Sequence, residues 1–136
     1  MINALITVKN TQKIEQSCDD IELISEGEYT YSKEKTLIKY KEIGPDGETK
    51  VTLGIKENEA VLIRENNVKT MMIFEPGRNY VSNYHTPYGD FNMRVITNTL
   101  KNGLTENGGE LLIKYELGMG NTQEVSNTVK ITVKPL

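Results

Sequence analysis

The sequence places its only histidine in a short segment rich in tyrosine, and this segment holds the side chains best suited to chemistry. Tyr84, His85 and Tyr88 lie on either side of Pro87. Tyrosine rings supply apolar walls and hydroxyl donors, and an imidazole titrates near neutral pH. Residues 84–91 are therefore a candidate mouth of a ligand pocket. The alternative is a structural corner, because a Pro-Tyr-Gly turn is explained by turn formation alone.

Three arginines form a second group of candidates. Arg64, Arg78 and Arg94 are the only arginines among sixteen basic residues. A guanidinium binds carboxylate or phosphate through two parallel hydrogen bonds, which lysine cannot do. Convergence of two arginines at one opening would therefore indicate an anionic ligand. Alternation along its segment places Arg94 on an outer face, so Arg64 and Arg78 are the ligand-binding candidates; exposure to solvent is their alternative.

The remaining reactive residues argue against catalysis. A single histidine excludes any metal site with two histidines, and any Ser-His-Asp or Cys-His mechanism would have to use His85. Cys18 has no disulfide partner, and its neighbours Asp19 and Asp20 disfavour a reactive thiolate. No phosphate-binding loop, dinucleotide fingerprint or metal-ligand spacing is present. We therefore expect a protein that is not an enzyme and that has no cofactor and no metal.

Charge and hydropathy narrow the possible partners and the location. The chain has 136 residues, a net charge of −3 and 37% hydrophobic residues. Nucleic-acid binders usually carry a basic face, so we expect no nucleic-acid partner. The sequence has neither a signal peptide pattern nor a long apolar run, which predicts a cytoplasmic protein without membrane association. The length predicts one domain over residues 1–136.

These candidate residues are positioned by segments in which apolar and polar residues alternate. Val129, Ile131 and Val133 alternate with Lys130 and Thr132, a period of two that is typical of half-buried strands. Turn residues recur every ten to fifteen positions or so, which indicates a meander of antiparallel strands. Residues 11–20 contain one large apolar residue and are expected to form a long loop. We predict about ten strands, over residues 2–10, 20–31, 34–43, 49–56, 59–65, 67–74, 78–85, 90–101, 109–117 and 123–134.

Short serial turns favour one architecture among all-β folds. A sandwich with Greek-key crossings needs longer connections, so we predict a closed or nearly closed antiparallel up-and-down β-barrel of about 8–10 strands. Barrels of this size can enclose a cavity. The inner parity is partly polar and aromatic, which suits water or a ligand better than a filled core. Its polar and aromatic members are Ser25, Tyr29, Tyr80, Ser82, Tyr84, Thr97, Thr99, Tyr115 and Asn127.

The order of segments resembles the YwiB-like family of small bacterial proteins of unknown function. The resemblance is carried by Ile21-Glu22-Leu23-Ile24-Ser25-Glu26-Gly27, Leu62-Ile63-Arg64, Met72-Ile73-Phe74-Glu75-Pro76-Gly77, the run from Tyr84 to Phe91, Gly108-Gly109-Glu110-Leu111 and Lys114-Tyr115-Glu116-Leu117. It covers nearly the whole chain through short motifs. The resemblance implies a calycin-like, lipocalin-type β-barrel, and it implies no activity.

The leading functional hypothesis is non-enzymatic binding of a small, partly apolar ligand inside the barrel. The candidate ligand-binding residues are Tyr84, His85, Tyr88, Tyr29, Tyr80, Ser82, Tyr115, Asn127, Arg64 and Arg78. The second hypothesis is a protein-interaction or self-association module with a filled core, acting through an exposed apolar patch. That patch would consist of Leu62, Ile96, Leu100 and Leu112, which fall on the predicted outer faces. An enzyme that uses His85 is the third and weakest hypothesis.

Overall fold

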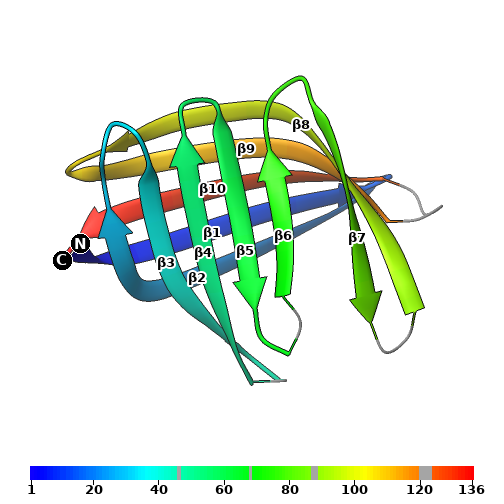
Figure 1. Ribbon diagram of the computed structural model, residues 1–136, viewed down its shortest axis with the longest axis horizontal. Coiled ribbons are helices and arrows are strands. Elements are labelled where there is room, and N and C mark those ends of the chain that lie inside the picture. The colour runs from blue at the N-terminus through cyan, green and yellow to red at the C-terminus, as the bar shows by residue number, and fades with distance from the viewer. Residues whose placement is uncertain (46, 68, 87–88, 120–123) are drawn as a thin grey trace.

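Alternating segments become strands throughout the computed structural model, which describes residues 1–45, 47–67, 69–86, 89–119 and 124–136, with side chains described except at 83–86, 91 and 119 (Figure 1). No helix in these ranges is long and apolar enough to cross a membrane. The strands are β1 (Ile2–Ile14), β2 (Ser17–Thr30), β3 (Thr36–Gly44), β4 (Gly47–Lys56), β5 (Glu59–Glu65), β6 (Lys69–Phe74), β7 (Asn79–Thr86), β8 (Gly89–Thr105), β9 (Gly108–Met119) and β10 (Val125–Pro135).

All ten strands belong to one antiparallel sheet whose order is β6-β5-β4-β3-β2-β1-β10-β9-β8-β7. Except for β6 and β7, which end the sheet, every strand pairs with its neighbours in sequence, and β1 joins β10, so the meander curls into a barrel (Figure 1). At the junction of β6 and β7, Thr97 accepts the bonds that link the two ends: Glu75 N to its Oγ1 at 3.2 Å and Gly77 N to its carbonyl at 3.4 Å. The predicted nearly closed up-and-down barrel is therefore confirmed.

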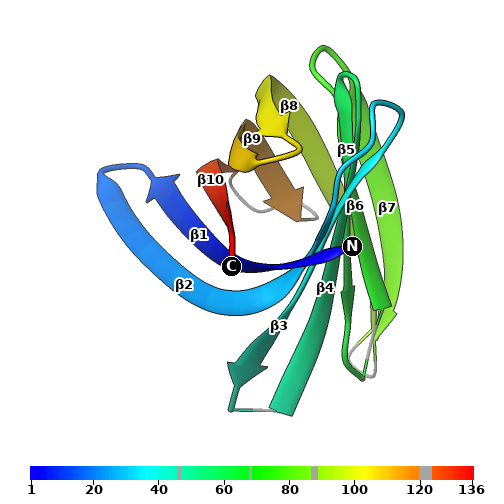
Figure 2. The ribbon, with the colours of Figure 1, turned by 90° about the vertical axis from the view of Figure 1, so that its left-hand side faces the viewer.

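The first hairpin corrects one prediction. The expected loop over residues 11–20 is wrong, because β1 and β2 pair continuously from Ile2 opposite Tyr29 to Ile14 opposite Ser17. The turn between them uses Glu15 at a φ of 55°, a left-handed conformation that single turn residues can adopt. A long hairpin thus extends beyond the body of the barrel (Figure 2). Its polar residues face solvent on both sides, which is why apolar content alone did not indicate strands.

Two neighbouring strands, β2 and β3, pair only over a short stretch. Their register covers Glu28 opposite Lys39, Tyr29 opposite Ile38 and Thr30 opposite Leu37. Before Gly27 the β1–β2 hairpin curves away from β3 and β4 (Figure 2). A Cβ at Gly27 would collide with the carbonyl oxygen of Lys39 and the side chain of Ile6, so only glycine permits this close approach. The barrel wall therefore divides at Gly27.

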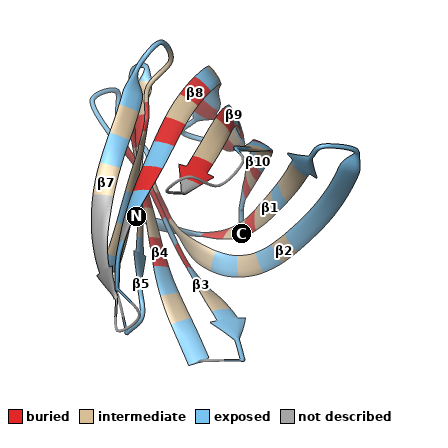
Figure 3. Ribbon diagram, turned by 90° about the vertical axis from the view of Figure 1, so that its right-hand side faces the viewer, coloured by how far each residue is buried: buried red, intermediate tan, exposed pale blue. Residues whose placement is uncertain are grey.

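Side chains of one parity fill the barrel, and the alternation of buried and exposed positions is visible along β8 and β9 (Figure 3). Of the predicted inner polar and aromatic residues, Tyr29, Thr97, Tyr115 and Asn127 are buried. The ring of Tyr115 packs against that of Phe74, with centroids 4.7 Å apart. The largest fully buried aliphatic side chains are Ile6, Ile38, Leu53, Ile55, Leu111, Ile113, Val51 and Val133.

A β-bulge reverses the predicted parity in the second half of β8. Thr97 pairs with Tyr115, but Thr99 pairs with Lys114, so Asn98 is the extra residue. Thr99 therefore lies on the outer face instead of the predicted inner one. Leu100, predicted to lie outside, packs against the core opposite Ile113.

The predicted outer apolar patch does not form. Leu62 pairs with Leu53 on β4 and packs against the core, as Leu100 does. Ile96 and Leu112 are partly buried. Two of the four patch residues are thus part of the interior, which removes the specific surface on which the interaction hypothesis depended.

Candidate functional site

The separation of β2 from β3 opens the barrel interior on one side. A cavity of about 440 Å³ lies there, between the inner faces of the β1–β2 hairpin, the β3–β4–β5 wall and the strands β9 and β10. This volume is in the range of pockets that hold small ligands. Most of its wall is apolar and comes from five or more strands. The apolar lining includes Val8, Leu23, Leu53, Leu62, Phe74, Ile113, Val129 and Ile131.

A polar cluster from β3 and β5 lines one side of this cavity. Tyr40 and Glu42 point inward because they are two residues apart on β3. The register runs from Tyr40 to Val51 on β4 and on to Arg64 on β5, so Arg64 shares the same face. Its guanidinium donates a hydrogen bond to the Glu42 carboxylate. The Arg64 side chain remains 45% exposed, so the cluster is a neutral ion pair on the solvent-facing side of the cavity.

The two cavity tyrosines remain protonated over the physiological pH range. Burial is the main reason that the pKa of Tyr40 rises well above its ordinary value, and the nearby Glu42 carboxylate raises it further. Burial raises the pKa of Tyr115 to about 12, against the opposing effect of the Arg64 guanidinium. The Tyr40 hydroxyl is hydrogen-bonded to Glu42, whereas the Tyr115 hydroxyl can act as a hydrogen-bond donor to a ligand; Arg64 lies within electrostatic reach of both.

Two asparagines beside the cavity have buried amide oxygens that lack a partner among the described residues. Asn10 lines the cavity from β1, and Asn127 lies on β10, where it pairs with Gln12. The Oδ1 atoms of both are buried without a hydrogen bond, whereas the Asn127 amide nitrogen donates to the Val125 carbonyl at 3.1 Å. An unsatisfied buried acceptor costs about 1–3 kcal/mol. A water or a ligand with a donor group would remove this cost.

Of the predicted ligand-binding residues whose side chains the structure describes, only two line the cavity. These are Tyr115 and Arg64. Asn127 is buried nearby and Tyr29 is buried toward the other end of β2, where its hydroxyl donates to the Thr105 carbonyl at 2.6 Å. Ser82 is half-buried on β7 and does not line the cavity.

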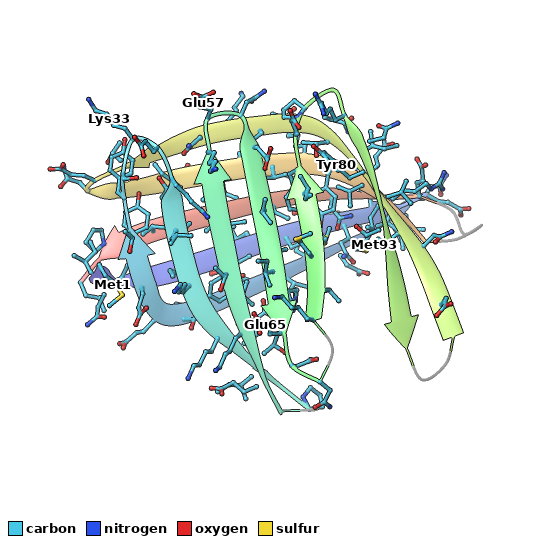
Figure 4. All side chains as sticks on the ribbon, viewed as in Figure 1. Met1, Lys33, Glu57, Glu65, Tyr80 and Met93 are labelled. Atoms are coloured by element: carbon cyan, nitrogen blue, oxygen red, sulfur yellow. The ribbon has the colours of Figure 1, made fainter. Side chains whose placement is uncertain are left out.

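Arg78 and Tyr80 lie at the opposite end of the β5–β6 hairpin from Arg64. Arg64 pairs with Thr70, whereas Phe74, which precedes Arg78, pairs with Ala60. Figure 4 shows the corresponding separation, with Glu57 and Glu65 at the two ends of β5. The Arg78 Nε lies 3.6 Å from a Glu75 carboxylate oxygen, and the Tyr80 hydroxyl donates to the other oxygen at 2.8 Å. Arg64 and Arg78 therefore do not converge on one anion.

The predicted site around the histidine falls largely outside the described residues. Tyr88 and the side chains of Tyr84 and His85 lie outside the described residues. Arg94, expected on the outer face, is exposed there and lies 3.7 Å from the Glu124 carboxylate. Within the described ranges, no group of three or more His, Cys, Asp and Glu residues is arranged to hold a metal ion.

Sequence reasoning missed three of the polar residues at the cavity: Tyr40, Glu42 and Asn10. Ile38, Tyr40 and Glu42 are each two residues apart in the predicted strand over residues 34–43, so Tyr40 and Glu42 share the face of Ile38. A carboxylate on the inner parity of a strand is unusual and could have been recognised as a candidate. The ion pair between Glu42 and Arg64 could not have been recognised, because it depends on the register of β3 and β5 across the intervening strand β4.

The fold and its cavity define a class of protein: a nearly closed antiparallel barrel of ten strands. The chain belongs to the family described as "Domain of unknown function (DUF1934)", which matches residues 6–131. It is 25% identical over 125 residues to the "Uncharacterized beta-barrel protein YwiB" of Bacillus subtilis (strain 168), covering 92% of this chain and 88% of that protein. The resemblance to YwiB-like proteins is thereby confirmed.

A solved structure has the same fold. The crystal structure of the ywiB protein from Bacillus subtilis superimposes with a TM-score of 0.82, covering 99% of this chain and 92% of that one at 20% identity. At this identity the likeness concerns the fold, and it confirms the ten-stranded barrel. The narrower calycin-like classification stays a prediction.

Proposed function

We propose that this protein binds a small, partly apolar molecule in the cavity between the β1–β2 hairpin and the β3–β4–β5 wall, and that it does so in the cytoplasm without catalysing a reaction. The observation that carries the proposal is the cavity of about 440 Å³, with a largely apolar wall and the Tyr40–Glu42–Arg64 cluster on one side. An apolar lining with a few convergent polar groups is the usual composition of small-molecule sites.

The polar groups suggest what the ligand carries. Because Glu42 already neutralises Arg64, a free carboxylate on the ligand would be repelled by Glu42. The protonated hydroxyl of Tyr115 offers a donor, the Tyr40 hydroxyl oxygen can accept because its proton is directed at Glu42, and the Asn10 Oδ1 offers a further acceptor. These groups favour an uncharged ligand with an apolar body and one end that both donates and accepts hydrogen bonds.

Native mass spectrometry of the protein purified from its source cytoplasm tests this proposal. We expect the wild type to carry an additional mass of a small molecule. Val129→Phe fills the cavity and should abolish this mass, because Val129 lines it. The matched control is Val61→Phe, which adds the same volume on the outer face of β5 and should retain the mass. Absence of any bound molecule from the wild type, or equal retention by both variants, would contradict the proposal.

The absence of catalysis is tested separately with the single histidine. His85→Ala should leave the identity and amount of the bound molecule unchanged. If the bound molecule in this variant were instead chemically different from that in the wild type, with the wild type converting one into the other, the protein would be an enzyme.

A further inference from the structure

The edge of β2 that faces away from β1 is free over most of its length. β2 pairs with β1 from Ser17 to Tyr29, but it pairs with β3 only from Glu28 to Thr30. Within the described part of the chain, no other strand pairs with residues 18–26 on this edge, and Figure 2 shows β2 with open space along this side. Near Gly27, where β3 is still close, the Ser25 hydroxyl donates to the Lys41 carbonyl at 3.2 Å. Every second residue of this edge therefore presents its main-chain N–H and C=O groups to solvent.

The side chains along this edge carry charge of one sign. β2 contains Asp19, Asp20, Glu22, Glu26 and Glu28, and it contains no lysine or arginine. Asp20, Glu22 and Glu26 face outward and are exposed, with the exposed Ile24 between them, as the pale blue positions along β2 indicate (Figure 3). The one ion pair described for them joins Glu22 to Lys9 on β1, at 3.8 Å. The outer face of the edge is therefore an acidic row with most of its charge uncompensated.

The inner side of the same edge is apolar. Ile21 and Leu23 point toward the cavity, and both line it. Ile21 is nevertheless 58% exposed, because no strand covers the mouth of the cavity at this point. A strand added beside residues 18–26 would place its inward side chains next to Ile21 and Leu23 and its outward side chains next to Asp20, Glu22 and Glu26.

We propose that the free edge of β2 binds an extended peptide segment in which apolar residues alternate with lysine or arginine. Main-chain hydrogen bonds to the edge supply affinity, and the two faces of β2 supply specificity for that alternation. A second copy of this chain is disfavoured as the occupant, because pairing of two β2 edges would bring the two acidic rows against each other. This partner is a protein segment, so the proposal is independent of the small molecule proposed for the cavity.

Titration with short synthetic peptides tests the proposal on the full-length protein at low ionic strength. The probe is the seven-residue peptide acetyl-Lys-Val-Lys-Val-Lys-Val-Lys-amide. Its controls are a block peptide with the same composition, in which four lysines precede three valines, and a peptide in which glutamate replaces lysine. We expect only the alternating basic peptide to bind, with amide chemical shifts and slowed hydrogen exchange confined to residues 18–26 and their β1 partners.

Backbone N-methylation distinguishes strand addition from simple charge attraction. A strand bonds to a neighbour through the amides of one edge, which belong to alternate residues. Two peptides are therefore compared, one methylated on the odd-numbered amides and the other on the even-numbered amides. The peptide whose methylated amides face away from β2 should bind normally, and the other should lose binding. Equal binding of both methylated peptides, or binding of the block peptide, would show attraction by charge alone and would overturn the proposal.

Charge reversal on the protein completes the test. The double variant Asp20→Lys, Glu26→Lys should bind the alternating basic peptide about tenfold more weakly, because two exposed ion pairs are replaced by repulsion. The matched control is Glu34→Lys, Glu106→Lys, which makes the same change in net charge at exposed positions outside residues 18–26 and should leave the affinity unchanged. Equal weakening in both variants, or peptide-induced shifts at β6 or β7, would overturn the assignment to β2.

Discussion

The two ends of β2 lie in contrasting surroundings, although they belong to one continuous strand. At the Tyr29 end, β2 has neighbours on both edges, and the Tyr29 hydroxyl bridges the barrel to the Thr105 carbonyl. At the Ile21 end, β2 has one neighbour, and the interior is a cavity in place of packed side chains. A single sheet can therefore be closed and filled at one end and open and hollow at the other, where one glycine lets two strands diverge.

Gly27 lies between the two ends of β2, and its replacement has the largest expected effect on stability. Gly27→Val should lower the free energy of unfolding by about 3 kcal/mol or more, because its Cβ would meet the backbone of Lys39, which cannot move without breaking the β2–β3 pairing. Urea denaturation followed by circular dichroism measures the change. Gly54→Ala is the control, since its Cβ would come closest to the flexible end of Lys35 and make an ordinary contact with Leu37, and it should change stability by less than about 1 kcal/mol. Equal effects of the two variants would refute the role assigned to Gly27.

Leucine truncation compares the packed end with the hollow end. Leu111→Ala should cost about 3 kcal/mol, because Leu111 is completely buried and its removal creates a new cavity. Leu62→Ala should cost about half as much, because Leu62 is only partly buried and already borders open space. Thermal or urea denaturation gives both values. A cost at Leu62 equal to that at Leu111 would mean that the cavity is closed and packed in solution.

Removal of single hydroxyl groups gives the smallest and most specific comparison. Tyr29→Phe should cost about 1 kcal/mol, because it leaves the Thr105 carbonyl without its donor. Tyr115→Phe should change stability less, since the Tyr115 hydroxyl faces the cavity, and should instead weaken ligand retention in native mass spectra. The opposite pattern, with a larger stability loss at Tyr115, would show that this hydroxyl supports the fold and is not available to a ligand.

Most strands could be predicted from the chain alone because side-chain alternation is a local property. The alternation of Val129, Ile131 and Val133 with polar residues predicts a strand without any knowledge of the neighbouring strands. The inward orientation of polar and aromatic side chains was also correctly predicted for Tyr29, Thr97, Tyr115 and Asn127, which are buried. The extension of the β1–β2 hairpin over residues 11–20 was missed because strands exposed on both faces have no apolar alternation to reveal them.

The candidate site was harder to predict because it depends on the relation between strands. The bulge at Asn98 moves Leu100 to the inside, and nothing in the local sequence marks it. Arg64 was selected for its chemistry, but its pairing with Glu42 follows from the register of β3, β4 and β5. The segment around His85, which the sequence emphasised most, contributes no described side chain to the cavity.

The sequence by itself determined the all-β class, the number of strands and the meander order, because alternation and turn residues act over a few neighbouring positions. Only the tertiary structure decided where the barrel wall divides, which polar residues meet at the cavity and which strand edge is left free. The physical reason is that these features depend on strand register and on the close approach of Gly27 to Lys39, which join residues that are distant in the chain.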